Sequence, residues 1–191
     1  MEDKIVEAAK SGNLAELRAL LTSGGETEIL DAFGWSPLMW AAAMGLPDVV
    51  ELLLENGANS EVQDKYGATA LMKACRRGYA DVVRVLIKHK ANVDASDEFG
   101  WTALMRAARG GHVEVVKLLL AAGCNKEAAD QYGATALIMA TAEGHINVVR
   151  ELLQAGADPH AQDRNGWTAL VWAQSKRHKD IVDLLKKYEK S

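Results

Sequence analysis

An Asp-x-x-Gly motif recurs in this chain at a fixed interval of 33 residues. It occurs five times, and no insertion or deletion disturbs the spacing. The glycines of the five copies are Gly34, Gly67, Gly100, Gly133 and Gly166. A repeat of this length is one supersecondary unit that cannot bury its apolar face alone and must stack on its neighbours. The interval therefore predicts a solenoid of stacked units.

Each unit predicts one turn followed by two helices. In the turn, Asp can bond its own backbone and Gly accepts a positive φ. A helix N-cap follows, which is Ser36 in the first unit and Thr in the later ones, and Pro37 suits the first helical position. An Ala-rich helix then ends near Gly45, and a second, amphipathic helix ends near Gly57. The sequence thus predicts an all-α chain.

These residues make the chain resemble the ankyrin-repeat family, whose 33-residue unit is a β-turn with two antiparallel helices. The resemblance implies an all-α ankyrin-repeat solenoid of helix-turn-helix units joined by β-turn loops, with about six repeats in one domain over residues 1–191. The full repeats are 31–63, 64–96, 97–129 and 130–162, and the capping repeats are 1–30 and 163–191.

The N-terminal repeat carries polar residues at positions that are apolar in the full repeats. Glu7 and Glu16 stand where the next repeat has Trp40 and Val49, and Asp3 is the expected N-cap of the first helix. A terminal repeat has no neighbour on its outer side, so these polar substitutions indicate a cap.

The family's usual Thr-Pro-Leu-His motif is altered in every repeat. Its His position holds Met39, Met72, Met105, Ile138 and Val171. In the family, this His takes part in hydrogen bonds between adjacent turns. We therefore expect apolar packing to hold this layer together here instead.

Composition excludes several classes of protein. The 22 basic and 26 acidic residues give a formal net charge of −4, which disfavours a general nucleic-acid binder. The two cysteines, Cys75 and Cys124, form neither a disulfide framework nor a metal-ligand pattern, and this indicates a reducing, cytoplasmic or nuclear location. No apolar run approaches the roughly 20 residues of a membrane span, and the N-terminus does not read as a signal peptide. We expect an intracellular monomer.

Catalysis has no support in the sequence. His112, His145 and His178 recur at one repeat position, which places them in a row and predicts a structural role between the two helices of a repeat. No phosphate loop, zinc pattern or nucleophile elbow occurs. We therefore expect no enzyme activity, no cofactor and no metal.

The residues that vary within the constant frame predict a binding surface. The resemblance implies that a partner is engaged through the turn tips and the exposed side of the first helices, on the concave face. The candidate partner-binding residues are Phe33, Trp35, Trp40, Met44, Tyr66, Lys73, Arg76, Arg77, Phe99, Trp101, Arg106, Arg109, Tyr132, Met139, Trp167 and Trp172. Aromatic and Arg side chains dominate hot spots, so the sequence predicts recognition of a protein or peptide with acidic and apolar residues.

Within this surface, cations from two adjacent repeats are expected to align into an exposed basic block. Its members are Lys73, Arg76, Arg106 and Arg109.

Four alternatives stay open: the chain is an engineered or consensus-derived binder; it is a scaffold or a piece of a larger protein; the basic block holds a polyanion or nucleic acid; or the tip aromatics only pack on adjacent tips. Trp35, Trp101 and Trp167 also alternate with Ala68 and Ala134, a weaker period of 66 residues.

Overall fold

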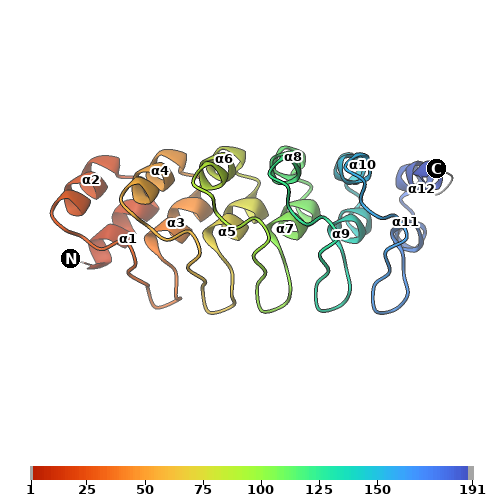
Figure 1. The fold of residues 1–191 in the computed structure, drawn as a ribbon, viewed down its shortest axis with the longest axis horizontal. Coiled ribbons are helices and arrows are strands. Elements are labelled where there is room, and N and C mark those ends of the chain that lie inside the picture. The colour runs from red at the N-terminus through yellow and green to blue at the C-terminus, as the bar shows by residue number, and fades with distance from the viewer. Residues whose placement is uncertain (1, 189–191) are drawn as a thin grey trace.

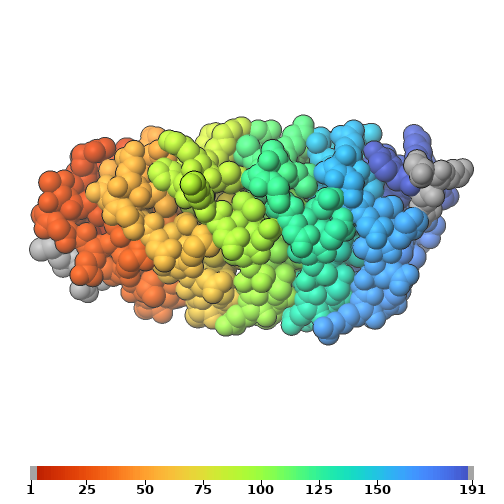
Figure 2. Space-filling model, in the orientation of Figure 1, coloured from red at the N-terminus to blue at the C-terminus, as the bar shows by residue number. Residues whose placement is uncertain are grey.

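The chain forms an elongated stack of six helix pairs (Figure 1). The computed structural model describes residues 2–188, with the backbone alone for residues 2 and 3. Odd-numbered helices form one row, even-numbered helices form a second row, and long loops project beyond the odd-numbered row (Figure 1). Over the described residues there are twelve helices and no strand beyond two isolated bridges, as the all-α prediction requires. In the space-filling view, the successive repeats lie as bands across the long axis (Figure 2).

The helices have the following bounds. They are α1 (Glu2–Ser11), α2 (Leu14–Thr22), α3 (Pro37–Met44), α4 (Pro47–Glu55), α5 (Ala70–Arg77), α6 (Ala80–Lys88), α7 (Ala103–Arg109), α8 (Val113–Ala121), α9 (Ala136–Ala142), α10 (Ile146–Gln154), α11 (Ala169–Lys176) and α12 (Lys179–Tyr188). Because the helical backbone of α1 already includes residue 2, the prediction that Asp3 is its N-cap is wrong.

The turn before each odd-numbered helix from α3 onward is closed by its aspartate. Asp64 Oδ1 accepts hydrogen bonds from the N–H groups of Tyr66 and Ala68, both at 2.9 Å. Gly67 has φ +78°, and a Cβ there would lie 3.0 Å from the amide nitrogen of Glu98 in the next turn. Glycine is therefore required both by the backbone conformation and by the close approach of the following repeat.

The odd-numbered helices pack against one another through small and apolar side chains. Ser36 caps α3 by accepting a hydrogen bond from the N–H of Met39 at 3.2 Å, and Thr does the same in the later repeats. Ala41 and Ala42 are completely buried. Met39, Met72 and Met105 are at most 1% exposed, which confirms the predicted apolar layer; only the terminal Val171 is open to solvent.

The histidine row also lies where the sequence predicts. Nε2 of His112 lies 3.1 Å from the carbonyl oxygen of Arg76 in the preceding repeat, and Nε2 of His145 lies 2.9 Å from that of Arg109. A Cβ on Gly78 would lie 2.5 Å from the His112 ring. These rings pack between repeats and join them, which confirms their structural role.

A second set of bonds joins the repeats on the side of the even-numbered helices. Carboxylates from one repeat accept the backbone N–H of a residue 31 positions later, in the next repeat. The pairs are Glu28 with Asn59, Glu61 with Asn92, Asp94 with Asn125, and Glu127 with Asp158. These bonds join the first four pairs of adjacent repeats, and the histidine row joins the last three pairs, so repeat 97–129 is bonded to both of its neighbours in both ways.

Candidate functional site

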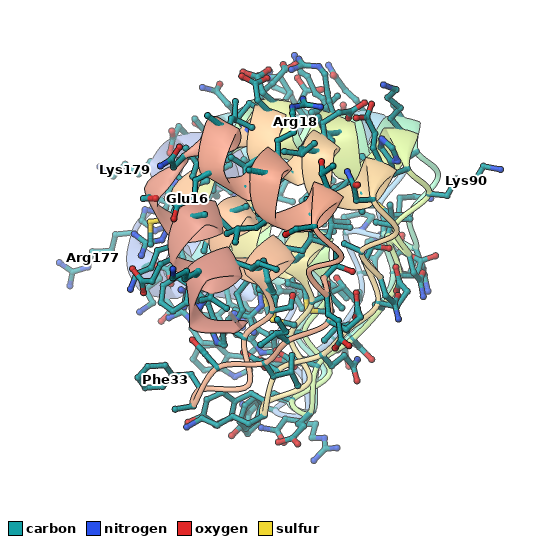
Figure 3. All side chains as sticks on the ribbon, turned by 90° about the vertical axis from the view of Figure 1, so that its left-hand side faces the viewer. Glu16, Arg18, Phe33, Lys90, Arg177 and Lys179 are labelled. Carbon is teal, nitrogen blue, oxygen red and sulfur yellow. The ribbon has the colours of Figure 1, made fainter. Side chains whose placement is uncertain are left out.

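Three cavities lie along the surface formed by the turn loops and the odd-numbered helices, which we call the groove. Their volumes are about 290 Å³ around Asp31 (the first cavity), 360 Å³ around Asp64 (the middle cavity) and 460 Å³ around Asp130 (the last cavity). Equivalent positions, 33 or 66 residues apart, line all three, so they lie on one face. Seen down the stack, Phe33 at the turn tips and Arg177 lie on one side, and Lys90 lies on the other (Figure 3).

Aromatic side chains at the tips of the turns are open to solvent. The exposed fractions are 60% for Phe33, 51% for Tyr66, 44% for Phe99 and 64% for Tyr132. The turns themselves are joined by backbone bonds, such as that from the N–H of Glu98 to the carbonyl of Tyr66 at 3.1 Å. Because the rings keep 44–64% of their surface exposed, they do not merely pack on adjacent tips, and they form an exposed row beside the groove.

In four of the five turns, the side chain nine residues after the turn aspartate reaches back to its second oxygen. The indole N–H of Trp40 donates to Asp31 Oδ2 at 2.8 Å, and that of Trp172 donates to Asp163 Oδ2 at 2.9 Å. The ammonium of Lys73 and the guanidinium of Arg106 form the corresponding ion pairs with Asp64 and Asp97. Sequence reasoning missed this relationship, although the spacing of an aspartate and a donor recurs in four repeats.

These pairs correct the prediction of an exposed basic block. Lys73 is only 8% exposed, and the Arg106 side chain is 18% exposed, because each cation is drawn inward to a buried carboxylate. Arg109 is paired with Glu143 at 3.2 Å and lies over the Trp101 ring at 5.2 Å. Among residues 2–188, Arg76 makes no ion pair, and it lines the middle cavity. Of the Lys and Arg residues predicted for the binding surface, only Arg76 and its exposed neighbour Arg77 therefore make no ion pair among the described residues.

The ionisation of the turn aspartates is tied to these bonds. Burial alone would raise the pKa of Asp64, but the Lys73 ammonium and two backbone N–H groups outweigh it and hold the pKa below its ordinary value. Asp31 and Asp163 have lowered pKa values in the same way, because backbone N–H groups and a tryptophan indole outweigh burial. Burial lowers the pKa of Lys73, despite the opposing effect of Asp64. For Arg76, burial and then Arg106 lower the pKa.

Trp40 and Trp172 are half-buried and donate their indole N–H groups to turn aspartates, and Trp101 and Trp172 line the last cavity. Trp40 packs on Trp35 with ring centroids 4.5 Å apart, and Lys10 lies 4.7 Å above its ring. Trp172 meets Trp167 edge to face at 5.0 Å. We expected Trp40 and Trp172 to be exposed binding residues. Both are instead half-buried, and their indoles bond the turn aspartates and pack on a neighbouring tryptophan. Met139 is also buried, at 7% exposed, and lines the last cavity.

The 66-residue alternation has a structural counterpart. The middle and last cavities lie where Ala68 and Ala134 replace the tryptophan that the other turns carry. A small residue beside the turn aspartate leaves space that the larger ring otherwise occupies. Trp101, from the preceding turn, forms part of the wall of the last cavity. The alternation thus accounts for the middle and last cavities, whereas the first cavity lies in a repeat that carries Trp35.

Over residues 2–188, no cluster of three or more His, Cys, Asp or Glu side chains is arranged to hold a metal ion. Cys75 and Cys124 are free and buried, and burial raises the pKa of Cys75 and brings that of Cys124 to about 11, so both thiols are protonated at neutral pH. None of the helices described is both long and apolar enough to cross a membrane.

Comparison with known proteins agrees with this architecture. The family model for ankyrin repeats (3 copies) matches residues 5–97, 89–163 and 130–191, which together span nearly the whole chain. No curated protein matches the chain. Ankyrin repeats generally act as protein–protein interaction modules, and the family is typically non-catalytic. With its turn, its two helices and its 33-residue period in place, the chain belongs to the ankyrin-repeat family.

Proposed function

We propose that the protein binds an extended segment of a partner protein along the groove, without catalysing a reaction. The observation that carries this proposal is the row of exposed tip aromatics beside three cavities, at positions that the fold does not need to be aromatic. Exposed aromatic rows next to concave sites are typical of protein interfaces. The tip rings supply apolar area, and the cavities accept individual side chains.

The middle cavity suits an acidic side chain of the partner. It is lined by three cations and one anion: Lys73, Arg76 and Arg106 against Asp64. Lys73 and Arg106 are already engaged, whereas Arg76 has no carboxylate partner in the part of the chain described. A guanidinium binds a carboxylate through two parallel hydrogen bonds, which gives both strength and orientation. An aspartate or glutamate of the partner is therefore proposed to pair with Arg76, next to Phe99.

The same charges favour a protein over a polyanion as the partner. Two of the four cations that the sequence suggested are neutralised within the fold, and a third, Arg109, is paired with Glu143. Nucleic-acid binding depends on many free cations that neutralise successive phosphates. We keep the proposal of a monomer in the cytoplasm or nucleus, which the two buried, unpaired cysteines support. The residue set predicted from the sequence is proposed as the contact surface.

Selection of random peptides on the immobilised full chain tests the proposal. Titration of a selected peptide is expected to give an affinity about tenfold or more lower for Arg76→Ala and for Phe99→Ala, the size of a hot-spot loss. Arg150→Ala is the matched control, because Arg150 is an exposed arginine on α10, in the other helix row. Failure to select any peptide, or a loss confined to Arg150→Ala, would contradict binding in the groove.

A further inference from the structure

One turn aspartate lacks the internal donor that the other four possess. Asp31, Asp64, Asp97 and Asp163 each receive a Trp, Lys or Arg side chain from nine residues later. In the repeat of Asp130 that position holds Met139, which has no N–H or O–H to donate. The sequence thus interrupts a regular feature of the fold at a single repeat.

The consequence is a carboxylate oxygen, in a mostly buried aspartate, that no N–H or O–H group of the described residues meets. Asp130 Oδ1 accepts the N–H groups of Tyr132 and Ala134 at 2.8 and 2.9 Å, as in the other turns. Oδ2 has no hydrogen-bond donor among the described residues, although Asp130 as a whole is only 8% exposed. The residue lines the last cavity, of about 460 Å³. A carboxylate of a mostly buried residue, with one oxygen left without a donor, is stabilised when a charged donor is supplied.

The rest of the last cavity suits a cation. Trp101, Tyr132 and Trp172 contribute aromatic walls, which attract ammonium and guanidinium groups. Its acids are Asp130, Glu143 and Asp163, against the cations Arg109 and Lys176. Glu143 is paired with Arg109 and Asp163 receives the Trp172 indole, whereas no side-chain donor of the described residues is bonded to Asp130. Lys176 lies over the Trp172 ring instead, at 5.9 Å. This balance is opposite in sign to that of the middle cavity.

We propose that the last cavity is a socket for a lysine or arginine side chain of the bound partner, which donates to Asp130 Oδ2. The incoming cation takes the place that Lys73 and Arg106 occupy in their own repeats. The inference rests on the proposed function and deepens it, because it adds a basic residue to the acidic one placed at Arg76. Two repeats separate the sites, which is about 16–20 Å at the usual spacing of packed helices. An extended segment covers that distance in about five or six residues.

The test needs no knowledge of the partner. N-acetyl-arginine amide is titrated into the full chain, and the indole N–H signals of Trp101 and Trp172 are followed by NMR. We expect saturable shifts at these two signals and not at Trp35. Asp130→Asn, which keeps an acceptor for the turn but removes the charge, should weaken binding about tenfold or more. Asp48→Asn, at an exposed acid on α4 in the other helix row, is the control and should bind as the parent does.

A second variant tests the site without changing Asp130, whose replacement could also disturb the turn. Met139→Lys leaves Asp130 in place and supplies the missing donor from within, at a position where Lys73 shows that a lysine fits. It should abolish binding of the arginine probe and raise the melting temperature, whereas Met139→Leu should do neither. Absence of shifts in the parent, or unchanged binding in both Asp130→Asn and Met139→Lys, would overturn the socket.

The selected peptides separate this inference from the proposed function. If the socket is correct, peptides selected on the parent should carry Lys or Arg five or six residues from an acid, and lose affinity for Met139→Lys. Peptides that depend on Arg76 and Phe99 but bind Met139→Lys as well as the parent would refute the socket and leave groove binding intact. Peptides that ignore Arg76 and Phe99, while the arginine probe still binds at Asp130, would refute the proposed function and leave the socket.

Discussion

Lys73 forms an ion pair with Asp64, nine residues before it, in a site where the lysine side chain is 10% exposed and the aspartate side chain 1% exposed. The pair joins the first helix of a repeat to the turn that precedes it. A carboxylate so far removed from water is costly without a donor, so Lys73 holds the turn and helix in register.

Replacing Lys73 by methionine, the residue that follows Asp130 at this spacing, should lower the free energy of unfolding. We expect a loss of about 1–3 kcal/mol, the cost of leaving a buried polar group unsatisfied. The measurement is chemical denaturation monitored by circular dichroism. The double variant Asp64→Asn/Lys73→Met should recover part of the loss, because the buried charge is gone; no recovery would show that the charge is not the cause.

Acid should destabilise the protein through its turn aspartates. Asp31, Asp64 and Asp163 have pKa values below the ordinary 3.8 in the folded chain, so the unfolded chain binds protons more readily. Their contribution to stability is present above about pH 4 and is lost as the pH falls through the lowered folded values. Melting temperatures measured from pH 6 to pH 2 should fall less steeply for Asp64→Asn than for the parent. Equal slopes would exclude Asp64 as a source of the acid sensitivity.

Among residues 2–188, two non-glycine residues adopt a left-handed backbone, and replacing either by glycine should raise the stability of the fold. Lys90 and Arg177 both have φ +63°, at positions where other repeats carry glycine. Relief of about 1–2 kcal/mol of backbone strain, less about 0.5–1 kcal/mol for the added freedom of the unfolded chain, predicts a gain near 0.5–1 kcal/mol for Lys90→Gly. Lys90→Ala is the control for loss of the side chain, and denaturant midpoints distinguish the two. An equal gain in both would mean that strain is not relieved.

Filling the last cavity should block the groove without unfolding the chain. Ala134→Trp introduces the residue that the neighbouring turns carry as Trp101 and Trp167. A peptide that uses this cavity should bind about tenfold or more weakly, since a buried hot-spot contact contributes about 2 kcal/mol or more. Calorimetric titration measures the loss, and the helical circular dichroism signal should be unchanged. Full affinity in this variant would place the partner elsewhere.

Most of the fold could be predicted because it is encoded locally. The turn aspartate, the Ser36 cap and the closing Gly45 act within a few residues of one another, and the later units repeat them with Thr as the cap and, in the last unit, Arg177 at the glycine position. The burial of Met39 and its equivalents follows from the same periodicity. Asp3 was misplaced because the end of a terminal helix has no such repeated context to define it.

The site was less predictable because its key contacts bridge a turn and a helix. Lys73 and Arg106 look like exposed helical cations in the sequence, and only the turn geometry shows that a buried carboxylate lies within reach. The cavity at Ala134 likewise depends on what the preceding turn places beside it. The sequence identified the tip aromatics as candidates, but it could not predict their exposure, because this depends on how adjacent turns pack.

The histidine row joins only the repeats toward the C-terminus. Nε2 of His112, His145 and His178 lies beside a carbonyl of the preceding repeat, whereas the same position holds Leu46 and Tyr79 in the first two full repeats. The contacts between repeats toward the C-terminus therefore include a histidine–carbonyl hydrogen bond that the first two contacts lack. Only the two joints that flank repeat 97–129 have both a histidine bond and a carboxylate bond, so fraying under tension or heat should begin at the ends of the stack and reach this repeat last. The middle cavity, lined by residues of repeats 64–96 and 97–129, spans the first of these two joints, so the beginning of the chain can loosen while this cavity keeps its shape.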